Sequence, residues 1–134
     1  MYILDTNTLI YFFKGIGAVS KHLLATPPKE IGIPSIVLFE LEVGIAKSSL
    51  PQKRKKQLKD FTSIIQVLPF GYEEAKYAAR IRVDLEEIGT PIGPYDLLIA
   101  AIALSRKGIL VTHNTNEFAR IPGLKIEDWY PESK

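Results

Sequence analysis

The sequence has no cysteine, and its only histidines are His22 and His113. The lack of cysteine excludes disulfide bonds, thiolate metal sites and a cysteine nucleophile, and two histidines are too few for a histidine-rich metal site. The longest apolar run, 97–104, has eight residues, whereas a membrane-spanning helix needs about 20. We therefore expect no membrane association, and any catalysis must rest on oxygen ligands.

A strong net charge is also missing, because 17 Lys and Arg residues nearly balance 15 Asp and Glu residues, giving +2. This excess does not by itself predict nucleic-acid binding. The apolar N-terminal stretch, 1–13, contains Asp5 and Asn7 and has no basic residue before it, unlike a secretory signal peptide. We therefore expect a cytoplasmic protein, which the absence of cysteine fits.

Short apolar segments alternate with helical patterns along the chain. The expected strands are 2–4, 31–33, 67–69, 109–112 and 124–126. The expected helices are 9–14, with Thr6 or Asn7 as its cap, 19–24, 35–46, 51–65, 72–88 (packing through Ala75, Ala78, Ala79 and Val83) and one from Pro94. This alternation predicts a parallel α/β sheet covered on both faces. No repeat or long linker divides the chain, so we expect one domain, 1–134.

Asp5 lies where the first strand is expected to end. In open α/β sheets, ligands bind at the carboxyl ends of the strands, so Asp5 is the first candidate for a functional site. The alternative is that Asp5 only caps the following helix, which is a common use of aspartate.

Glu40 lies in a helical segment, 36–45, that is apolar on nearly every side. A carboxylate buried there needs a base, a proton or a metal. Glu42 points about 200° away around the helix, whereas Gly44 lies one turn from Glu40 and leaves space beside it. We expect Glu40 to face inward and Glu42 outward; the alternative is that Glu40 lies on the solvated edge of the helix.

Two further polar groups lie at the start of an expected helix or directly after an expected strand. Asp96 lies in the first turn of the helix from Pro94, where the helix dipole favours a carboxylate, whether as a ligand or as an ordinary N-terminal acid. After the fourth strand, Asn114 and Glu117 can supply oxygen and Thr112 a hydroxyl; the alternative is an ordinary capped turn.

Carboxylates without histidine or cysteine select hard cations, Mg²⁺ or Mn²⁺. Such ions activate water and stabilise the leaving oxygen in phosphodiester hydrolysis. The acids together therefore favour a metal-dependent enzyme that acts on a phosphodiester.

The chain resembles PIN domains, above all the toxin ribonucleases of VapBC-type toxin–antitoxin systems, in four motifs that follow the family order. They are MYILDTNTLI at the start, ELEVG at 40–44, GTPIGPYDLLIAAIA at 89–103 and LVTHNTNEFARIPGLKIEDW at 110–129. The resemblance covers nearly the whole chain. It implies a three-layer α/β/α fold, Mg²⁺- or Mn²⁺-dependent endoribonuclease activity, homodimerisation and inhibition by a cognate antitoxin.

The resemblance also assigns roles to residues. Asp5, Glu40 and Asp96 match the three acidic positions of the family. Where many relatives have a fourth acid, this chain has Asn114, with Glu117 three residues later, so either could complete the site. Thr6 and Asn7 match the polar residues after the first Asp, where Asn7 would orient Asp5. The RNA target stays open, because toxins of this type cut tRNA, rRNA or mRNA.

Two other functions stay open from the sequence. Haloacid-dehalogenase-like phosphatases also place an Asp after their first strand, but they normally have a second Asp two residues later, where this chain has Asn7. A PIN-like module that binds RNA or protein without catalysis is the other alternative, which Asn114 leaves possible.

The net charge of +2 conceals a basic segment. Between Lys47 and Lys59 there are six cations and no acid, so the rest of the chain has 11 cations against 15 acids, or −4. In a nuclease this segment is a candidate phosphate-binding track for RNA; the alternative is a solvated helix face. The candidate RNA-binding residues are Lys53, Arg54, Lys55, Lys56 and Lys59.

Overall fold

The structure is a computed structural model that describes residues 1–132. Five parallel strands form one sheet in the order β3-β2-β1-β4-β5. The strands are β1 (Tyr2–Leu4), β2 (Ile31–Pro34), β3 (Gln66–Leu68), β4 (Ile109–Val111) and β5 (Lys125–Glu127). The helices are α1 (Thr6–Lys14), α2 (Val19–Leu24), η1 (Pro28–Glu30), α3 (Ser35–Ala46), α4 (Pro51–Thr62), α5 (Tyr72–Glu87), α6 (Pro94–Ser105) and α7 (Thr115–Phe118).

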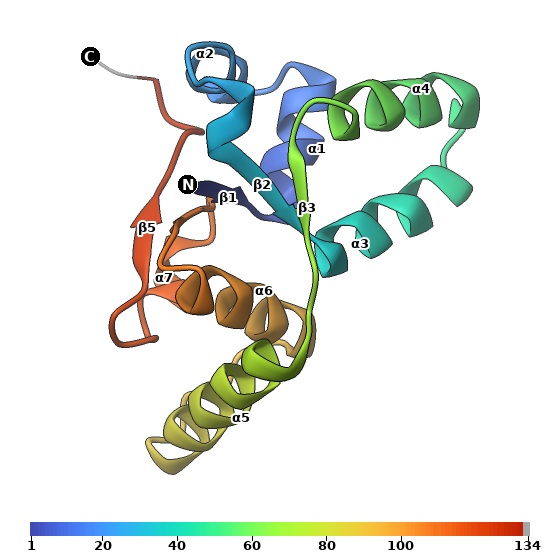
Figure 1. Ribbon diagram of the computed structural model, residues 1–134. Helices are drawn as coiled ribbons and strands as arrows, with labels where there is room; N and C mark the ends of the chain where they lie inside the picture. Colours follow the sequence, from blue (N-terminus) through green and yellow to red (C-terminus); the bar gives the residue numbers. More distant parts are fainter. Residues whose placement is uncertain (133–134) are drawn as a thin grey trace.

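The helices cover the two faces of the sheet, with α1, α2 and α4 on one side and α5 and α6 on the other (Figure 1). This arrangement confirms the expected α/β/α fold. Helix α3 extends beyond the end of β2, and α6 begins close to α3. Because all five strands are parallel, their carboxyl ends meet at one edge of the sheet. That edge holds the candidate site.

The central strands are buried on both faces, which explains their unbroken apolar sequences. Ile3 and Leu4 of β1 and Leu110 and Val111 of β4 have no exposed surface. In β2, Gly32 lies so close to its neighbours that an added Cβ would be 3.0 Å from Leu68 Cδ1. The glycine that weakens the strand pattern is therefore the residue that lets β2 and β3 pack closely.

The packing face expected for α5 is wrong in three of its four positions. Ala75, Ala79 and Val83 are exposed, the last by 49%. The buried stripe consists of Ala78, Ile81 and Leu85. This stripe has helical i, i+3, i+7 spacing, and the larger side chains at 81 and 85 bury more apolar area against α6 than alanines would.

Several boundaries also differ slightly from the expectation, and those of α4 and β3 are examples. Helix α4 ends at Thr62 rather than near residue 65, and β3 begins one residue earlier, at Gln66. The middle of α6, 99–103, is completely or almost completely buried, which its small alanines allow. Among residues 1–132, no helix has both the length and the apolar character needed to cross a membrane.

Candidate active site

Asp5 lies at the carboxyl end of β1 and is only 5% exposed. It is the N-cap of α1, as the alternative interpretation of Asp5 predicted, whereas Thr6 and Asn7, the other expected caps, lie inside the helix; Asp5 Oδ1 accepts a hydrogen bond from Thr8 N–H at 2.9 Å. Asp5 N–H donates to Val111 O at 3.1 Å, which joins the site to β4. Asp5 can therefore cap the helix and also belong to the site, because the cap uses only one of its two carboxylate oxygens.

Burial raises the pKa of Asp5, while hydrogen bonds from the Thr112 hydroxyl and from Thr8 act in the opposite direction. Thr112 has no exposed surface, and its Oγ1 accepts Asn114 N–H at 3.0 Å. Thr112 therefore connects the first acid to the polar segment after β4. The side chain expected to orient Asp5, Asn7, is exposed, and the hydrogen bonds to Asp5 come from the two threonines.

Glu40 lies in the second turn of α3 and is half-buried. Its Oε1 accepts a hydrogen bond from Thr6 Oγ1 at 2.7 Å, a contact between residues 34 positions apart. Glu42 is exposed, so the expected inward and outward orientations of the two acids are confirmed. Gly44 has no atom within 4 Å of an added Cβ, which leaves open space on the Glu40 face.

Asp96 lies in the first turn of α6, next to Glu117 of α7. Burial raises the pKa of Asp96 to about 7, with further contributions from the neighbouring Glu117, Asp5 and Glu40 carboxylates. Four acids from four segments therefore act on one another across a small region. A proton or a cation is needed there to relieve their mutual repulsion.

The two side chains that the sequence offered for the fourth position, Asn114 and Glu117, contact each other. Asn114 Nδ2 donates to Glu117 Oε2 at 2.7 Å, and Gly93 N–H donates to Glu117 Oε1 at 3.1 Å. Burial tends to raise the pKa of Glu117, but these hydrogen bonds outweigh it and the pKa is lowered. Glu117 is therefore the carboxylate beside Asp96, and Asn114 holds it in place.

The donor set fits a hydrated Mg²⁺ or Mn²⁺ ion. No three acidic or histidine side chains in residues 1–132 form a ready-made metal cage. Mg²⁺, however, is usually held by one or two carboxylates, several waters and substrate phosphates. Asp5 and Asp96, which interact electrostatically and belong to different elements, are the pair best suited to that mode, with Glu40 beside them.

Sequence reasoning missed three groups that shape this site. Thr8 bonds to Asp5, and its position three residues after the cap was an available signal, since that N–H is a usual partner of a capping side chain. Gly93 N–H bonds to Glu117, and Arg120 Nη1 donates to Pro91 O at 3.2 Å. The latter two anchor the loop before α6, and no local pattern indicates them.

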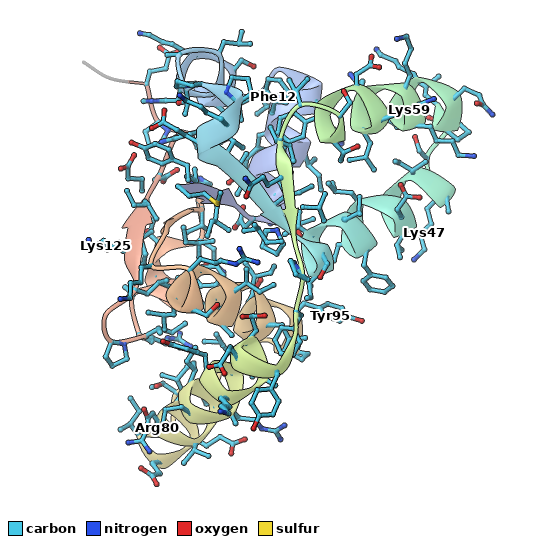
Figure 2. The ribbon with its side chains drawn as sticks, viewed as in Figure 1. Phe12, Lys47, Lys59, Arg80, Tyr95 and Lys125 are labelled. Carbon is cyan, nitrogen blue, oxygen red and sulfur yellow. The ribbon has the colours of Figure 1, made fainter. Side chains whose placement is uncertain are left out.

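The basic segment extends along α4 and the end of α3, away from the acids (Figure 2, where Lys47 and Lys59 are labelled). Lys53, Lys55, Lys56 and Lys59 are exposed, and Lys56 pairs with Asp60 at 2.9 Å. Arg54 differs, because its Nη1 donates to Gln57 Oε1 at 2.8 Å and to Phe13 O at 3.4 Å. Arg54 thus fastens α4 to α1.

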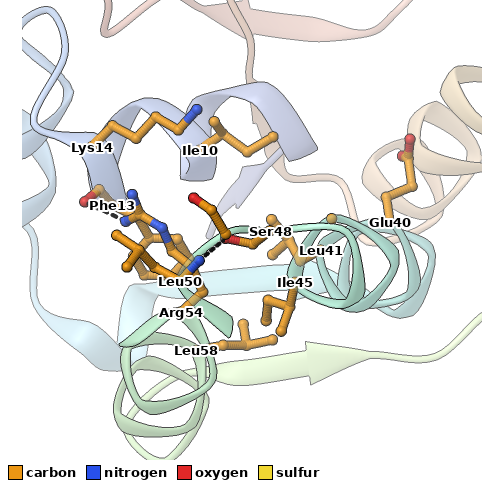
Figure 3. A pocket seen from close by; sticks show the side chains of 12 residues that line it. Ile10, Phe13, Lys14, Glu40, Leu41, Ile45, Ser48, Leu50, Arg54 and Leu58 are labelled. Carbon is orange, nitrogen blue, oxygen red and sulfur yellow. Dashed lines mark hydrogen bonds between the residues drawn. The ribbon is translucent and has the colours of Figure 1, made fainter. Parts of the chain in front are cut away.

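A cavity of about 370 Å³ lies between α1, α3 and α4 (Figure 3). Its apolar lining consists of Ile10, Phe13, Leu41, Ile45, Leu50 and Leu58. Glu40 stands at one end of the cavity, with Lys14 and Arg54 toward the other. The cavity therefore extends from Arg54 of the basic segment to Glu40.

Comparisons with known proteins agree with this geometry. The PIN domain family matches residues 2–124. A Salmonella typhimurium protein named tRNA(fMet)-specific endonuclease VapC is 39% identical over 128 residues, which cover 96% of this chain and 97% of that protein. Ribonuclease VapC2 of Rickettsia felis is 36% identical over 137 residues, covering 96% and 98%.

Two solved structures are similar over the same extent. VapBC2 from Rickettsia felis, bound to a DNA fragment from its promoter, gives a TM-score of 0.88 at 36% identity and covers 96% of this chain and 98% of that one. DNA-bound VapBC from Salmonella typhimurium gives 0.88 at 39% identity, covering 96% and 97%. Since the family match and the curated relatives extend over nearly its whole length, the chain belongs to the PIN-domain family and, within it, to the VapC ribonucleases.

Proposed function

We propose that this protein is a Mg²⁺- or Mn²⁺-dependent endoribonuclease, the toxin of a type II toxin–antitoxin pair, with Asp5, Glu40 and Asp96 as its metal-binding acids. The ribonuclease activity follows from its family. The observation that carries the metal and the residues is the crowding of carboxylates around Asp96, whose pKa is raised to about 7. A divalent cation relieves this crowding and is the cofactor that such a donor set selects.

A bound Mg²⁺ or Mn²⁺ supplies charge neutralisation and polarises the scissile phosphate. Asp5 is the anchor, because its hydrogen bonds to Thr8 and Thr112 fix its orientation and it is almost fully buried. Glu40 and Asp96 are more exposed and can accept the proton of the attacking water. The water oxygen then bonds to phosphorus, the bond from phosphorus to the 3′ oxygen breaks, and the 3′ oxygen takes up a proton from solvent, which leaves a 5′-phosphate and a 3′-hydroxyl.

We propose initiator tRNA as the first substrate to test. The supporting observation is that two curated relatives, from Salmonella typhimurium and Shigella flexneri, are named tRNA(fMet)-specific endonucleases and are 39% and 38% identical over 96% of this chain. The alternative targets are other tRNAs, rRNA and mRNA.

The decisive experiment is end-mapping of RNA after incubation of the purified protein with total RNA and with initiator tRNA, in Mg²⁺, in Mn²⁺ and in EDTA. We expect one defined cut that needs the metal and is lost in Asp5→Asn. Retention of RNA without turnover in any metal would instead support the non-catalytic binding module. Equal cleavage in EDTA would contradict the metal site.

We propose that the cognate antitoxin inserts an apolar segment into the cavity between α1, α3 and α4. The solved VapBC structures pair a toxin with its antitoxin, and here the cavity ends at Glu40. An arginine carried by that segment would reach the carboxylates and compete with the metal. Leu50→Lys, at a cavity-lining residue that is 52% exposed, should prevent complex formation with the cognate antitoxin and leave RNA cleavage intact.

We also propose a homodimer. Phe39 of α3 and Tyr95 of α6 are 51% and 47% exposed and form an edge-to-face pair with ring centroids 5.7 Å apart. Val43, also on α3, is 40% exposed. A second copy that covers this apolar group accounts for its exposure. Light scattering should report a dimer for the wild type and a monomer for Phe39→Ser/Tyr95→Ser.

A further inference from the structure

Three aromatic side chains beside the acids are not used by the proposed chemistry. The ring of His113 stacks on Tyr130, with centroids 4.2 Å apart and planes at 23°. Tyr11 of α1 meets His113 edge-on, at 6.1 Å and 81°. The His113 side chain is 43% exposed. We name this group, His113 with Tyr130 and Tyr11, the His113 shelf.

Hydrogen bonds and packing contacts hold the residues of the His113 shelf in place. His113 Nδ1 donates to Asp128 Oδ2 at 2.9 Å, and Asp128 Oδ1 accepts Tyr130 N–H at 3.0 Å. Tyr130 O accepts Ala18 N–H at 2.9 Å. The tyrosine ring also lies against Gly17, where an added Cβ would be 2.9 Å away. The imidazole is thus fixed in one orientation before any ligand binds.

His113 of the shelf lies at the same end of the sheet as Asp5. Strand β1 lies between β2 and β4 in the sheet. Asp5 at the end of β1 therefore has α3, with Glu40, on one side and His113, which follows β4, on the other. The residues on either side of His113 belong to the site, since Thr112 bonds to Asp5 and Asn114 to Glu117.

His22, the other histidine, shows the contrast. It stacks on Trp129 at 5.6 Å and 15°, and Trp129 is 4% exposed and packs on Tyr2 at 5.3 Å. This pair packs against Tyr2, the first residue of β1. His22 thus belongs to the packing of the C-terminal segment, whereas His113 offers an exposed ring beside the acids.

We infer that His113 is a specificity-determining residue, on whose exposed face an unstacked base of the RNA stacks next to the cleaved phosphate. This inference rests on the proposed ribonuclease function. Proteins commonly bind unpaired bases by stacking on aromatic or imidazole rings. A rigid ring lowers the entropy lost on binding. Removing such a stack weakens binding roughly five- to a hundredfold.

The test uses a short RNA that contains the cleavage site mapped for the wild-type protein. Four derivatives of this RNA each carry a single abasic nucleotide. It stands at one of the two positions before the cleaved bond or at one of the two positions after it. KM and kcat are measured with wild type, His113→Ala, His113→Phe and the matched control His22→Ala. We expect one abasic position to lower kcat/KM roughly five- to a hundredfold in wild type, mainly through KM, and less than about twofold in His113→Ala.

The variants separate stacking from a structural role. His113→Phe keeps a ring but loses the bond to Asp128, so it should retain the abasic penalty, and His22→Ala should behave as wild type. If each abasic substitution lowers kcat/KM equally in wild type and in His113→Ala, the inference is overturned. His113 would then serve only to hold the C-terminal segment in place. Failure of the wild type to cleave any RNA would instead overturn the proposed function, and this inference with it.

Discussion

Thr6 Oγ1 donates a hydrogen bond of 2.7 Å to Glu40 Oε1. This bond joins the first turn of α1 to the second turn of α3 and turns the Glu40 carboxylate toward the edge where Asp5 and Asp96 lie. Thr6 follows Asp5 directly in the chain, so one short segment supplies an acid and positions another.

Thr6→Val should lower the cleavage rate about tenfold, because Glu40 loses the donor that orients it while the side-chain volume is conserved. Thr6→Ser keeps the hydroxyl and should restore most of the rate. Single-turnover cleavage measures both. Equal rates for the valine and serine variants would show that the bond has no role in catalysis.

Asp5→Asn should reduce cleavage by at least a hundredfold while the protein stays folded, because an amide oxygen still accepts Thr8 N–H but carries no charge for the metal. Asp5→Ala removes the cap too, which typically costs about 1 kcal/mol. Initial rates in Mn²⁺ and thermal unfolding measure the two effects. Glu42→Gln, an exposed acid on α3, is the matched control and should cleave at the wild-type rate.

The contribution of Asp96 to the stability of the metal-free protein should fall as pH rises from about 4 to about 7. The folded state raises the pKa of Asp96 from 3.8 to about 7, so it binds the proton more tightly than the unfolded chain does, and deprotonation in this window favours unfolding. Asp96→Asn should remove much of this loss and raise the Tm at pH 8 by a few degrees.

Thermal unfolding of both proteins in EDTA at pH 5 and pH 8 tests this sign. Added Mg²⁺ should raise the Tm of the wild type at pH 8 but not that of Asp96→Asn, since a ligand stabilises only the state that binds it. The interpretation fails if the difference in Tm between the two proteins is the same at both pH values.

Glu117→Gln should weaken cleavage more than Asn114→Ala does. Glu117 accepts hydrogen bonds from Gly93 and Asn114 and its charge lies beside Asp96, whereas Asn114 acts only through Glu117. Mn²⁺ titration of the rate measures both variants. A larger loss for Asn114→Ala would make the amide, rather than the carboxylate, the fourth group of the site.

The double variant Lys53→Gln/Lys55→Gln should weaken RNA binding. The slope of the logarithm of the binding constant against the logarithm of salt concentration should also become shallower, by about one unit for each lysine–phosphate contact that is lost. Binding of a non-cleaved RNA to the Asp5→Asn protein, measured across a salt series, gives this slope. Lys125→Gln changes an exposed lysine on the far side of the molecule (Figure 2) and is the control. An unchanged slope would identify the basic segment as a solvated helix face.

Most of the fold could be predicted from the sequence, because strand and helix patterns are local. The apolar runs at the starts of β1 and β4 and the Gly–Pro start of α6 determine their elements within a residue or two. The packing face of α5 could not be predicted, since the alanines at 75, 78 and 79 and Val83 form a stripe as plausible as the true one. Only the position of α6 selects Ala78, Ile81 and Leu85.

The sequence alone determined which chemistry is possible: without cysteine and with two histidines, the acids at strand ends and helix starts can bind only a hard cation, which we propose as the cofactor. Only the tertiary structure decided which side chains hold those acids. Thr6 reaches Glu40 across 34 residues and Gly93 reaches Glu117 across 24. Such contacts arise when parallel strands bring their ends together, and no local periodicity encodes them.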